Sequence, residues 1–442
     1  MHRPALVPLA VLVLWLGAAQ GNTATAGDSP KSPNIVLLLA DDLGYGDVGA
    51  YGARFVRTPA IDSLAQQGVR FTQFFASANV CTPSRAGLLT GRYPVRSRLA
   101  GDVIFPEAEY GLGEGEVTLA EILKAAGYDT WIVGKWHLGH TPSAWPTRHG
   151  FDYFFGIQYS NDMEGVALFR NQEKIEDPLR QSTIHARLAN EAARLIASSG
   201  DRPFFLYLPT VAPHYPNVPG KAFRKRSAAG PYGDVVEEMD AGIAKVLEAI
   251  EDSGKTRETL VIFTSDNGRA WDGSGGAARG GKAGTWEGGY LVPLVVRWPG
   301  VIPPGVTTSG LSMNIDLMPT LAAVAGAGVP ADLQMDGRDV SALLLGAAVS
   351  PHEALYFFTG DRIAAVRTQR WRYLVRTFMQ VWEIDHLDPG YRHPLLYDIE
   401  THGSELFNMA DSEPEVLKRM QSLLDAGRKE LEGIPQHQSV GD

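Results

Sequence analysis

The chain has 442 residues, of which 44% are apolar and 20% charged, the balance of a folded globular protein and not of a disordered one. Its 40 basic and 50 acidic residues give a net charge of −10, which argues against a nucleic-acid coat protein or a binder of anionic membranes. A single cysteine, Cys81, excludes an intrachain disulfide and any zinc or iron–sulfur site built from several cysteines. The composition predicts a soluble α/β enzyme.

The first 26 residues have the layout of an export signal. An uncharged run over residues 4–19 follows a short polar start, and Ala24-Thr25-Ala26 is a small-x-small cleavage pattern. A membrane-spanning helix needs about 20 apolar residues, and this run is shorter and contains Pro8 and Gly17. We therefore expect a signal peptide at 1–26 and no stable membrane insertion after its cleavage. One cysteine and no Asn-x-Ser/Thr sequon favour a bacterial periplasmic or secreted protein.

Five short apolar runs predict buried strands of a mostly parallel sheet, each followed by a polar or glycine-rich corner. They lie at 35–40, 128–133, 204–208, 260–264 and 291–296. Helical patterns lie between them, starting at Thr58-Pro59, at a capping box formed by Thr118 and Glu121, within 236–250, and at Asp316. This alternation predicts helices on both faces of the sheet. Ligands of such sheets bind beyond the carboxyl ends of the strands, so the polar corners should converge in space.

The pattern changes after residue 345. Short runs at 355–358, 363–366, 371–375 and 395–398 predict antiparallel strands, and 414–432 predicts an amphipathic terminal helix. We expect a catalytic domain at 33–345 and a smaller C-terminal subdomain at 346–442. The glycine-rich stretch 268–289, within the first of these domains, would suit a flexible linker. Because it also holds Lys282 and Trp286, an ordered loop lining a site is the better interpretation.

Cys81 occupies a position that favours a functional role. Thr82 is suited to cap a helix and Pro83 to open it, which places Cys81 just before a helix N-terminus, where backbone N–H groups attract an anion. Arg85 lies one turn further on and can point back to the same place. A lone cysteine is more often a small buried apolar residue, and a thiolate nucleophile also stays open.

Two oxygen-rich pairs, Asp41-Asp42 and Asp266-Asn267, follow two of the predicted strands. Three carboxylates and one amide suit a hard cation, Ca²⁺ or Mg²⁺, better than zinc, although such pairs are also common turn residues. Further cationic or titratable groups stand at other corners: Lys135, His137, His214 and Lys282. Together with a metal ion and Arg85, this set fits the binding of a tetrahedral oxyanion such as sulfate or phosphate.

These segments carry a family resemblance. Residues 81–92 (CTPSRAGLLTGR) resemble the first signature of the type I sulfatases, 127–137 (GYDTWIVGKWH) their second, and 34–47 (NIVLLLADDLGYGD) their opening strand and metal corner. The resemblance continues through 280–289 to 396–398 and so covers nearly all of the mature chain. Two further segments, 156–162 and 212–216, look most like the arylsulfatase A branch.

The resemblance implies an alkaline-phosphatase-like α/β sandwich: a large, mostly parallel central sheet flanked by helices, with a small C-terminal antiparallel sheet and a helix. It also implies an enzyme that hydrolyses a sulfate monoester to an alcohol and inorganic sulfate. In this family a formylglycine-generating enzyme oxidises the motif cysteine, here Cys81, to Cα-formylglycine (3-oxoalanine), and the hydrate of that aldehyde attacks sulfur. A serine would form a stable sulfate ester, whereas a gem-diol has an internal route to release the sulfate.

Carried over residue by residue, the resemblance also implies individual roles. Ca²⁺, with Mg²⁺ as the alternative, would be bound by Asp41, Asp42, Cys81, Asp266 and Asn267. Arg85 and Lys135 would hold the nucleophile, and His137 would accept a proton from its second hydroxyl during sulfate release. Lys135, Ser160, His214 and Lys282 would contact the substrate. His214, rather than Lys282, would protonate the leaving oxygen.

Three other interpretations stay open at this point. A phosphonate or phosphate monoester hydrolase would share the scaffold and the metal corner. A catalytically dead oxyanion-binding protein would be expected to lack part of the ligand set, which is complete here. A cysteine hydrolase would be inactivated by thiol alkylation. The sequence leaves the natural ester open among aryl, sugar and lipid sulfates, and we expect no nucleic-acid partner.

Overall fold

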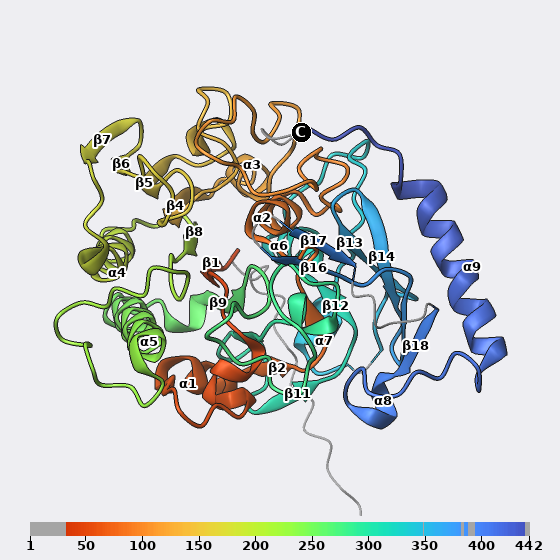
Figure 1. Ribbon diagram of the computed structural model, residues 1–442. Coiled ribbons are helices and arrows are strands. Elements are labelled where there is room, and N and C mark those ends of the chain that lie inside the picture. The colour runs from red at the N-terminus through yellow and green to blue at the C-terminus, as the bar shows by residue number, and fades with distance from the viewer. Residues whose placement is uncertain (1–31, 348, 382–383, 388–393, 438–442) are drawn as a thin grey trace, which may run out of the picture. The chain divides into compact units, whose positions relative to one another are not determined.

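The computed structural model describes residues 32–347, 349–381, 384–387 and 394–437 (Figure 1). The predicted signal peptide at 1–26 lies outside the described residues. Among the helices of this described part, none combines the length and the apolar content that crossing a membrane requires.

A ten-stranded sheet organises the larger part of the chain, in the order β11-β2-β10-β9-β1-β8-β4-β5-β6-β7. Its strands are β1 (Asn34–Ala40), β2 (Val69–Phe71), β4 (Asp129–Lys135), β5 (Tyr153–Ile157), β6 (Leu168–Arg170), β7 (Glu173–Glu176), β8 (Phe204–Pro209), β9 (Thr259–Ser265), β10 (Leu294–Arg297) and β11 (Val306–Thr308). The five central strands β9, β1, β8, β4 and β5 run parallel. Every residue of β1, β8 and β9 is buried, as their uninterrupted apolar runs predict for strands covered on both faces.

Helices cover both faces of this sheet (Figure 1). Along β1, Ile35 and Leu37 belong to the apolar cluster of one face and Val36 and Leu38 to that of the other. The first face is covered by α2 (Cys81–Thr90), α3 (Leu119–Ala125) and α6 (Leu317–Ala325). The second is covered by α1 (Pro59–Gln67), α4 (Gln181–Ala197) and α5 (Gly230–Asp252). The predicted sheet with helices on both sides is therefore confirmed.

A smaller antiparallel sheet follows, in the order β13-β14-β15-β18. It comprises β13 (Leu355–Thr359), β14 (Arg362–Arg367), β15 (Trp371–Leu374) and β18 (Leu395–Asp398), and α9 (Pro414–Leu431) packs against it through Met420 and Leu424. The same apolar cluster includes Phe75 and Tyr93, so this sheet packs directly on the larger part of the chain. Shorter elements are β3 (Phe74–Phe75), β12 (Ser312–Met313), β16 (Phe378–Val381), β17 (Ile384–Leu387), α7 (Ser341–Leu344) and α8 (Ile399–His402).

One strand runs against the predicted direction. The run expected as a parallel strand at 291–296 forms β10, which spans Leu294–Arg297 and is antiparallel to both of its neighbours, β9 and β2. A parallel neighbour needs a long crossover connection, usually a helix. Between β9 and β10 the chain forms only one 3₁₀ turn, Glu287–Gly289, and it returns into the sheet from the edge at which β9 ended.

The start of α2 also differs from the prediction. The helix begins at Cys81 itself, with Val80 as its N-cap residue, so Thr82 is not the cap. The Thr82 hydroxyl instead donates a hydrogen bond to the His137 carbonyl at 2.9 Å. A side chain committed to a distant partner is not available to cap its own helix, and Cys81 therefore lies in the first turn of α2.

Candidate active site at the carboxyl edge of the sheet

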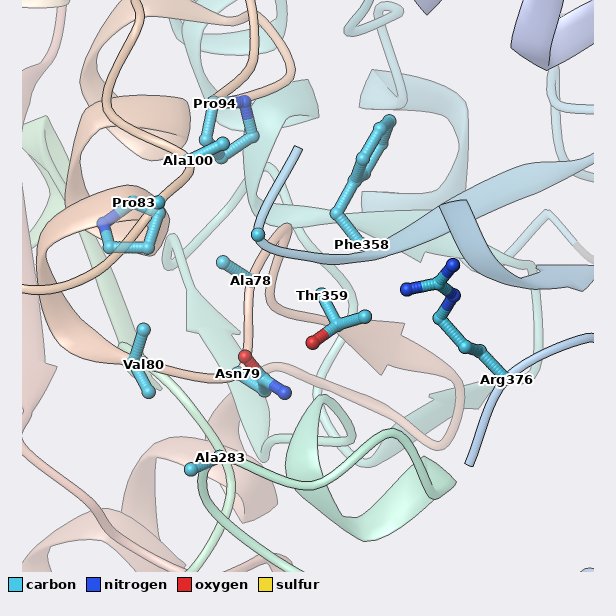
Figure 2. A pocket seen from close by; sticks show the side chains of 12 residues that line it. Ala78, Asn79, Val80, Pro83, Pro94, Ala100, Ala283, Phe358, Thr359 and Arg376 are labelled. Carbon is cyan, nitrogen blue, oxygen red and sulfur yellow. The ribbon is translucent and has the colours of Figure 1, made fainter. Parts of the chain in front are cut away.

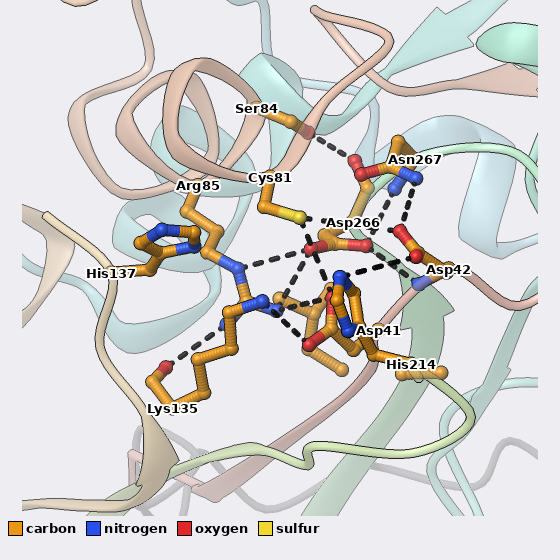
Figure 3. A network of polar contacts seen from close by, with 12 residues as sticks. Asp41, Asp42, Cys81, Ser84, Arg85, Lys135, His137, His214, Asp266 and Asn267 are labelled. Atoms are coloured by element: carbon orange, nitrogen blue, oxygen red, sulfur yellow. Dashed lines mark hydrogen bonds and ion pairs between the residues drawn. The ribbon is translucent and has the colours of Figure 1, made fainter. Parts of the chain in front are cut away.

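The polar corners predicted from the sequence meet at one edge of the large sheet (Figure 3). Asp41 and Asp42 follow β1, Lys135 ends β4, His214 lies in the loop after β8, and Asp266 and Asn267 follow β9. These four strands are parallel neighbours, so their carboxyl ends lie side by side. The first turns of α2 add Cys81 and Arg85, and the glycine-rich loop 268–289 adds Lys282.

Arg85 is the central cation of this site. Its side chain is fully buried, with Nε 3.0 Å and Nη2 2.8 Å from Oδ2 of Asp266. Nη2 also lies 3.4 Å from Oδ1 of Asp41, and Nη1 donates to the Lys135 carbonyl at 2.9 Å. A buried charge is tolerated only when it is paired and hydrogen-bonded. The two carboxylates therefore fix the guanidinium, and it fixes them in turn.

Lys135 pairs with the other oxygen of Asp41. Its Nζ lies 2.7 Å from Oδ2 of Asp41 and 3.1 Å from Oγ of Ser160. Burial by itself would raise the pKa of Asp41, but Lys135, His214 and Arg85 together hold that pKa well below its ordinary value. Asp41 is thus an ionised carboxylate in a place from which water is excluded.

Asp42 contacts the remaining polar side chains of the site. Lys282 Nζ donates to its Oδ2 at 2.7 Å, and His214 Nε2 lies 3.5 Å from the same oxygen. The Asn267 amide donates to Oδ1 at 2.8 Å. Burial works to lower the pKa of Lys282, but the Asp42 carboxylate outweighs it and raises the pKa above its ordinary value. Lys282 therefore stays charged.

The Cys81 thiol faces this pair of aspartates. Its Sγ lies 3.5 Å from Oδ1 of Asp41 and 4.0 Å from Oδ1 of Asp42. Burial raises the pKa of the thiol above its ordinary value, although Lys135 and Lys282 oppose the shift. A thiol that keeps its proton is a poor nucleophile. The environment of Cys81 accordingly disfavours a simple cysteine hydrolase.

Part of this site could hold a metal ion. Ligand atoms of Asp41, Asp42, Cys81 and His214 lie within 4.8 Å of one another. Asp266 directs Oδ2 to Arg85, while its Oδ1 accepts the backbone N–H groups of Asp42 at 3.1 Å and Asn267 at 2.9 Å. The amide oxygen Oδ1 of Asn267 is buried and has no hydrogen-bond partner among the described residues. A free amide oxygen beside ionised carboxylates is the donor set that a hard divalent cation prefers.

His137 follows β4 with φ +59°, a left-handed conformation that is unusual for histidine. Its backbone is held by the Thr82 hydroxyl and by the Gln158 carbonyl, which accepts its N–H at 3.0 Å. Nε2 lies 3.1 Å from the Ile104 carbonyl and must donate to it, while Nδ1 is buried without a partner in the described part of the chain. Burial, Lys135 and Arg85 lower the pKa of His137 well below its ordinary value. The ring is therefore neutral, with one basic nitrogen free.

Two residues that shape the site, Thr82 and Ser84, received no role in it from the sequence. Thr82 accepts the Ile104 N–H at 3.0 Å while holding His137. Ser84 donates to the Asp266 carbonyl and accepts from Asn314 at 2.9 Å. His214 Nδ1 donates to the Tyr215 carbonyl at 2.6 Å, which leaves Nε2 to face Asp42. The clue to Thr82 and Ser84 in the sequence was their place beside Cys81 and Arg85 in the first turns of the helix.

Comparisons with known proteins agree with this geometry. The Sulfatase family model matches residues 33–327, and the model "N-sulphoglucosamine sulphohydrolase, C-terminal" matches residues 282–430. Arylsulfatase A of Homo sapiens is 40% identical, over 89% of this chain and 87% of the relative. Steryl-sulfatase of Mus musculus is 36% identical, over 88% of this chain and 77% of the relative. Among solved structures, the PsFucS1 sulfatase from Pseudoalteromonas sp. superposes with a TM-score of 0.83 at 28% identity, covering 92% of each chain.

Replacing Arg85 by alanine should destabilise the fold strongly, because it leaves the Asp41 and Asp266 carboxylates buried without their shared cation. Removing one partner of a buried ion pair costs about 3–5 kcal/mol, measurable as the free energy of unfolding in urea with a chelator present. Arg419→Ala is the matched control, since Arg419 and its partner Glu353 are 65% and 67% exposed and 3.2 Å apart. We expect at most about 1 kcal/mol there. Equal effects of the two substitutions would contradict the central role of Arg85.

Proposed function

The chain belongs to the sulfatase family and hydrolyses sulfate esters, and we propose that it does so through a formylglycine made from Cys81 beside a bound divalent cation. The observation that carries this proposal is the surroundings of Cys81. Its Sγ lies at the N-terminus of α2, 3.5 and 4.0 Å from two buried carboxylates, while its own thiol chemistry is suppressed. The residue is thus placed for catalysis but unsuited to it as a free thiol.

Two groups complete the proposed chemistry. The hydrated aldehyde would supply one hydroxyl to attack sulfur and a second whose deprotonation expels the bound sulfate and restores the aldehyde. A divalent cation would polarise a sulfate oxygen and lower the pKa of the attacking hydroxyl. We assign its binding to the modified Cys81 with Asp41, Asp42, Asp266 and Asn267, and we propose Ca²⁺, with Mg²⁺ as the alternative. The free Oδ1 of Asn267 and the ionised Asp41 support an oxygen-based site.

Two cations would stabilise the nucleophile, and two further side chains would bind the sulfate. Arg85 and Lys135 are buried against the carboxylates beside Cys81 and would stabilise negative charge there. Lys282 and His214, both facing Asp42, would bind sulfate oxygens, with Ser160 as a further contact through Lys135.

The leaving oxygen needs a proton, and His214 is the better donor. Burial and Lys282 lower the pKa of His214, against the opposing effect of Asp42, whereas the pKa of Lys282 is raised. A group of lower pKa releases its proton more readily to a departing alkoxide. Lys282 would keep its proton and act as a fixed positive charge.

His137 is the proposed base for sulfate release. Its neutral ring, with Nε2 engaged by Ile104 and Nδ1 free, can accept a proton at Nδ1 alone. The Thr82 hydroxyl and the Ile104 backbone fix the ring, so the accepting nitrogen needs no rearrangement.

We also propose how Cys81 is modified and where the protein is exported. A formylglycine-generating enzyme would convert Cys81, and residues 1–26 would direct export to the periplasm or the medium of a bacterium. The smaller antiparallel sheet and α9 would form a C-terminal subdomain starting near residue 346, after a catalytic domain at 33–345.

Mass spectrometry of the tryptic peptide spanning residues 71–85 tests the modification directly. We expect the peptide from protein made together with a formylglycine-generating enzyme to have lost H₂S and gained one oxygen, because Cys81 has become an aldehyde. Turnover of para-nitrophenyl sulfate should rise in proportion to the modified fraction, and Cys81→Ala should be inactive. Full turnover by a preparation whose Cys81 is entirely thiol would overturn the mechanism.

Metal binding and turnover should be lost together in Asp266→Ala, because the site loses one carboxylate and the anchor of Arg85. The measurement is the metal content of the purified protein by elemental mass spectrometry, beside its sulfatase activity. Asp425→Ala, at an exposed position on α9, should keep both. A fully active Asp266→Ala enzyme whose metal resists chelation would refute the assignment of Asp266.

His137→Ala should retain sulfate on the protein, since attack on sulfur does not require the proposed base but release does. The expected result is a burst of about one nitrophenol per active site followed by arrest, with an intact mass increased by one SO₃ group relative to the aldehyde hydrate. His140→Ala, near in sequence and half-buried, should turn over without an adduct. Loss of activity with neither burst nor adduct would show that His137 acts at another step.

A further inference from the structure

A cavity of about 270 Å³ lies against the site and includes walls from both parts of the chain (Figure 2). Val80 and Pro83, on either side of Cys81 in sequence, line it together with Ala283, the neighbour of Lys282. The opposite wall comes from the smaller sheet, with Phe358 and Thr359 at the end of β13 and Arg376 just after β15. The cavity therefore lies between the segment around Cys81 and the C-terminal sheet.

Its size limits what it can receive. A dry cavity of about 150 Å³ holds one benzene ring, and ligand pockets begin at about 300 Å³. At about 270 Å³ the cavity has room for one six-membered ring with substituents. Its lining is mixed, with apolar residues such as Val80 and Pro83 beside the polar Asn79, Thr359 and Arg376.

Arg376 is the unusual member of the lining. None of the other described lining residues carries a charge, and Arg376 makes no hydrogen bond or ion pair with any described residue. Three other arginines of this part of the chain are paired: Arg367 with Glu287 at 3.0 Å, Arg370 with Asp398 at 2.6 Å, and Arg372 with Glu405. Arg362, at the start of β14, also has no ion pair among the described residues, but it is exposed and lies outside the cavity. A half-buried guanidinium left without a carboxylate, in a chain of net charge −10, has its planar donor fork available for an anion.

We propose that this cavity receives the alcohol part of the sulfate ester, and that Arg376 selects esters whose ring carries a second negative charge, a carboxylate or a second sulfate. The inference rests on the proposed function, since it takes Cys81 as the site of sulfur attack. Thr359 would add a neutral hydrogen bond beside Arg376 (Figure 2). Arg376 touches no reacting atom, so it determines specificity and does not catalyse.

The experiment compares two substrates, para-nitrophenyl sulfate and its analogue with a carboxylate ortho to the nitro group, on formylglycine-bearing protein. The variants are Arg376→Gln, Arg376→Lys and, as the matched control, Arg370→Gln, whose arginine lies on the same sheet but outside the cavity. Each substrate is compared between variants, so differences in intrinsic leaving-group reactivity cancel.

Arg376→Gln should raise KM for the carboxylated ester about tenfold or more, as expected for a lost charge-assisted hydrogen-bond pair. Its kcat, and both constants for para-nitrophenyl sulfate, should stay near those of the unaltered enzyme. Arg376→Lys should give an intermediate KM, and Arg370→Gln should change neither substrate. The same result with a disulfated phenol would assign sulfate as well as carboxylate to the subsite.

A preference that survives Arg376→Gln, or an equal loss for both esters, overturns the role of Arg376 while leaving the proposed function intact. If the unaltered, formylglycine-bearing enzyme hydrolyses neither ester, the proposed function fails and the inference fails with it. Turnover of para-nitrophenyl sulfate therefore distinguishes failure of the proposed function from failure of the role assigned to Arg376.

Discussion

The site depends above all on the pairing of buried charges around Arg85. Three carboxylates, Asp41, Asp42 and Asp266, and three cations, Arg85, Lys135 and Lys282, stand at one edge of the sheet, almost all of them shielded from water. Each would be costly to bury alone, and each is tolerated because its partner is also there. The same mutual neutralisation would let the site accept both an anionic ester and the proposed divalent cation, since neither would enter a strongly charged site. The parallel strands make this arrangement possible, because their carboxyl ends present side chains from distant parts of the sequence at adjacent positions.

The smaller sheet does more than enclose the core. Glu287, in the glycine-rich loop, accepts from Arg367 at 3.0 Å, and its N–H donates to Glu405 at 2.9 Å. Arg372 reaches the Thr285 carbonyl in the same loop at 2.7 Å. These contacts are buried and lie a few residues from Lys282. They fix a segment that its nine glycines would otherwise leave with many conformations. The C-terminal sheet thus holds Lys282 against Asp42 and, through the end of β13 and the loop after β15, forms one wall of the cavity beside Cys81.

Local patterns were sufficient for the elements that depend on local chemistry. The capping box at Thr118 forms as predicted, with its hydroxyl accepting the Glu121 N–H at 3.2 Å and Glu121 accepting the Thr118 N–H at 2.7 Å. The direction of β10 could not be predicted, because a short buried run has the same composition in either orientation. The helix α4 was missed although Ile184, Leu188 and Ala192 recur on its buried face. The free nitrogen of His137 was beyond prediction, since it depends on the Ile104 carbonyl, 33 residues away.

The groups proposed to act on the sulfate lie at the large sheet, whereas Arg376 follows a strand of the smaller sheet, and this separation affects which alcohol the enzyme can accept. Every group proposed to act on the sulfate is tied into the buried charge network, so changing one disturbs the others and the stability of the fold. Arg376 lies outside the segments that resemble the sulfatase signatures and shares no contact with that network among the described residues. Its replacement leaves no buried carboxylate unpaired. The alcohol that the enzyme accepts can therefore change at the loop after β15 without any change in the chemistry at Cys81, and we infer that selectivity and catalysis are physically separable in this protein.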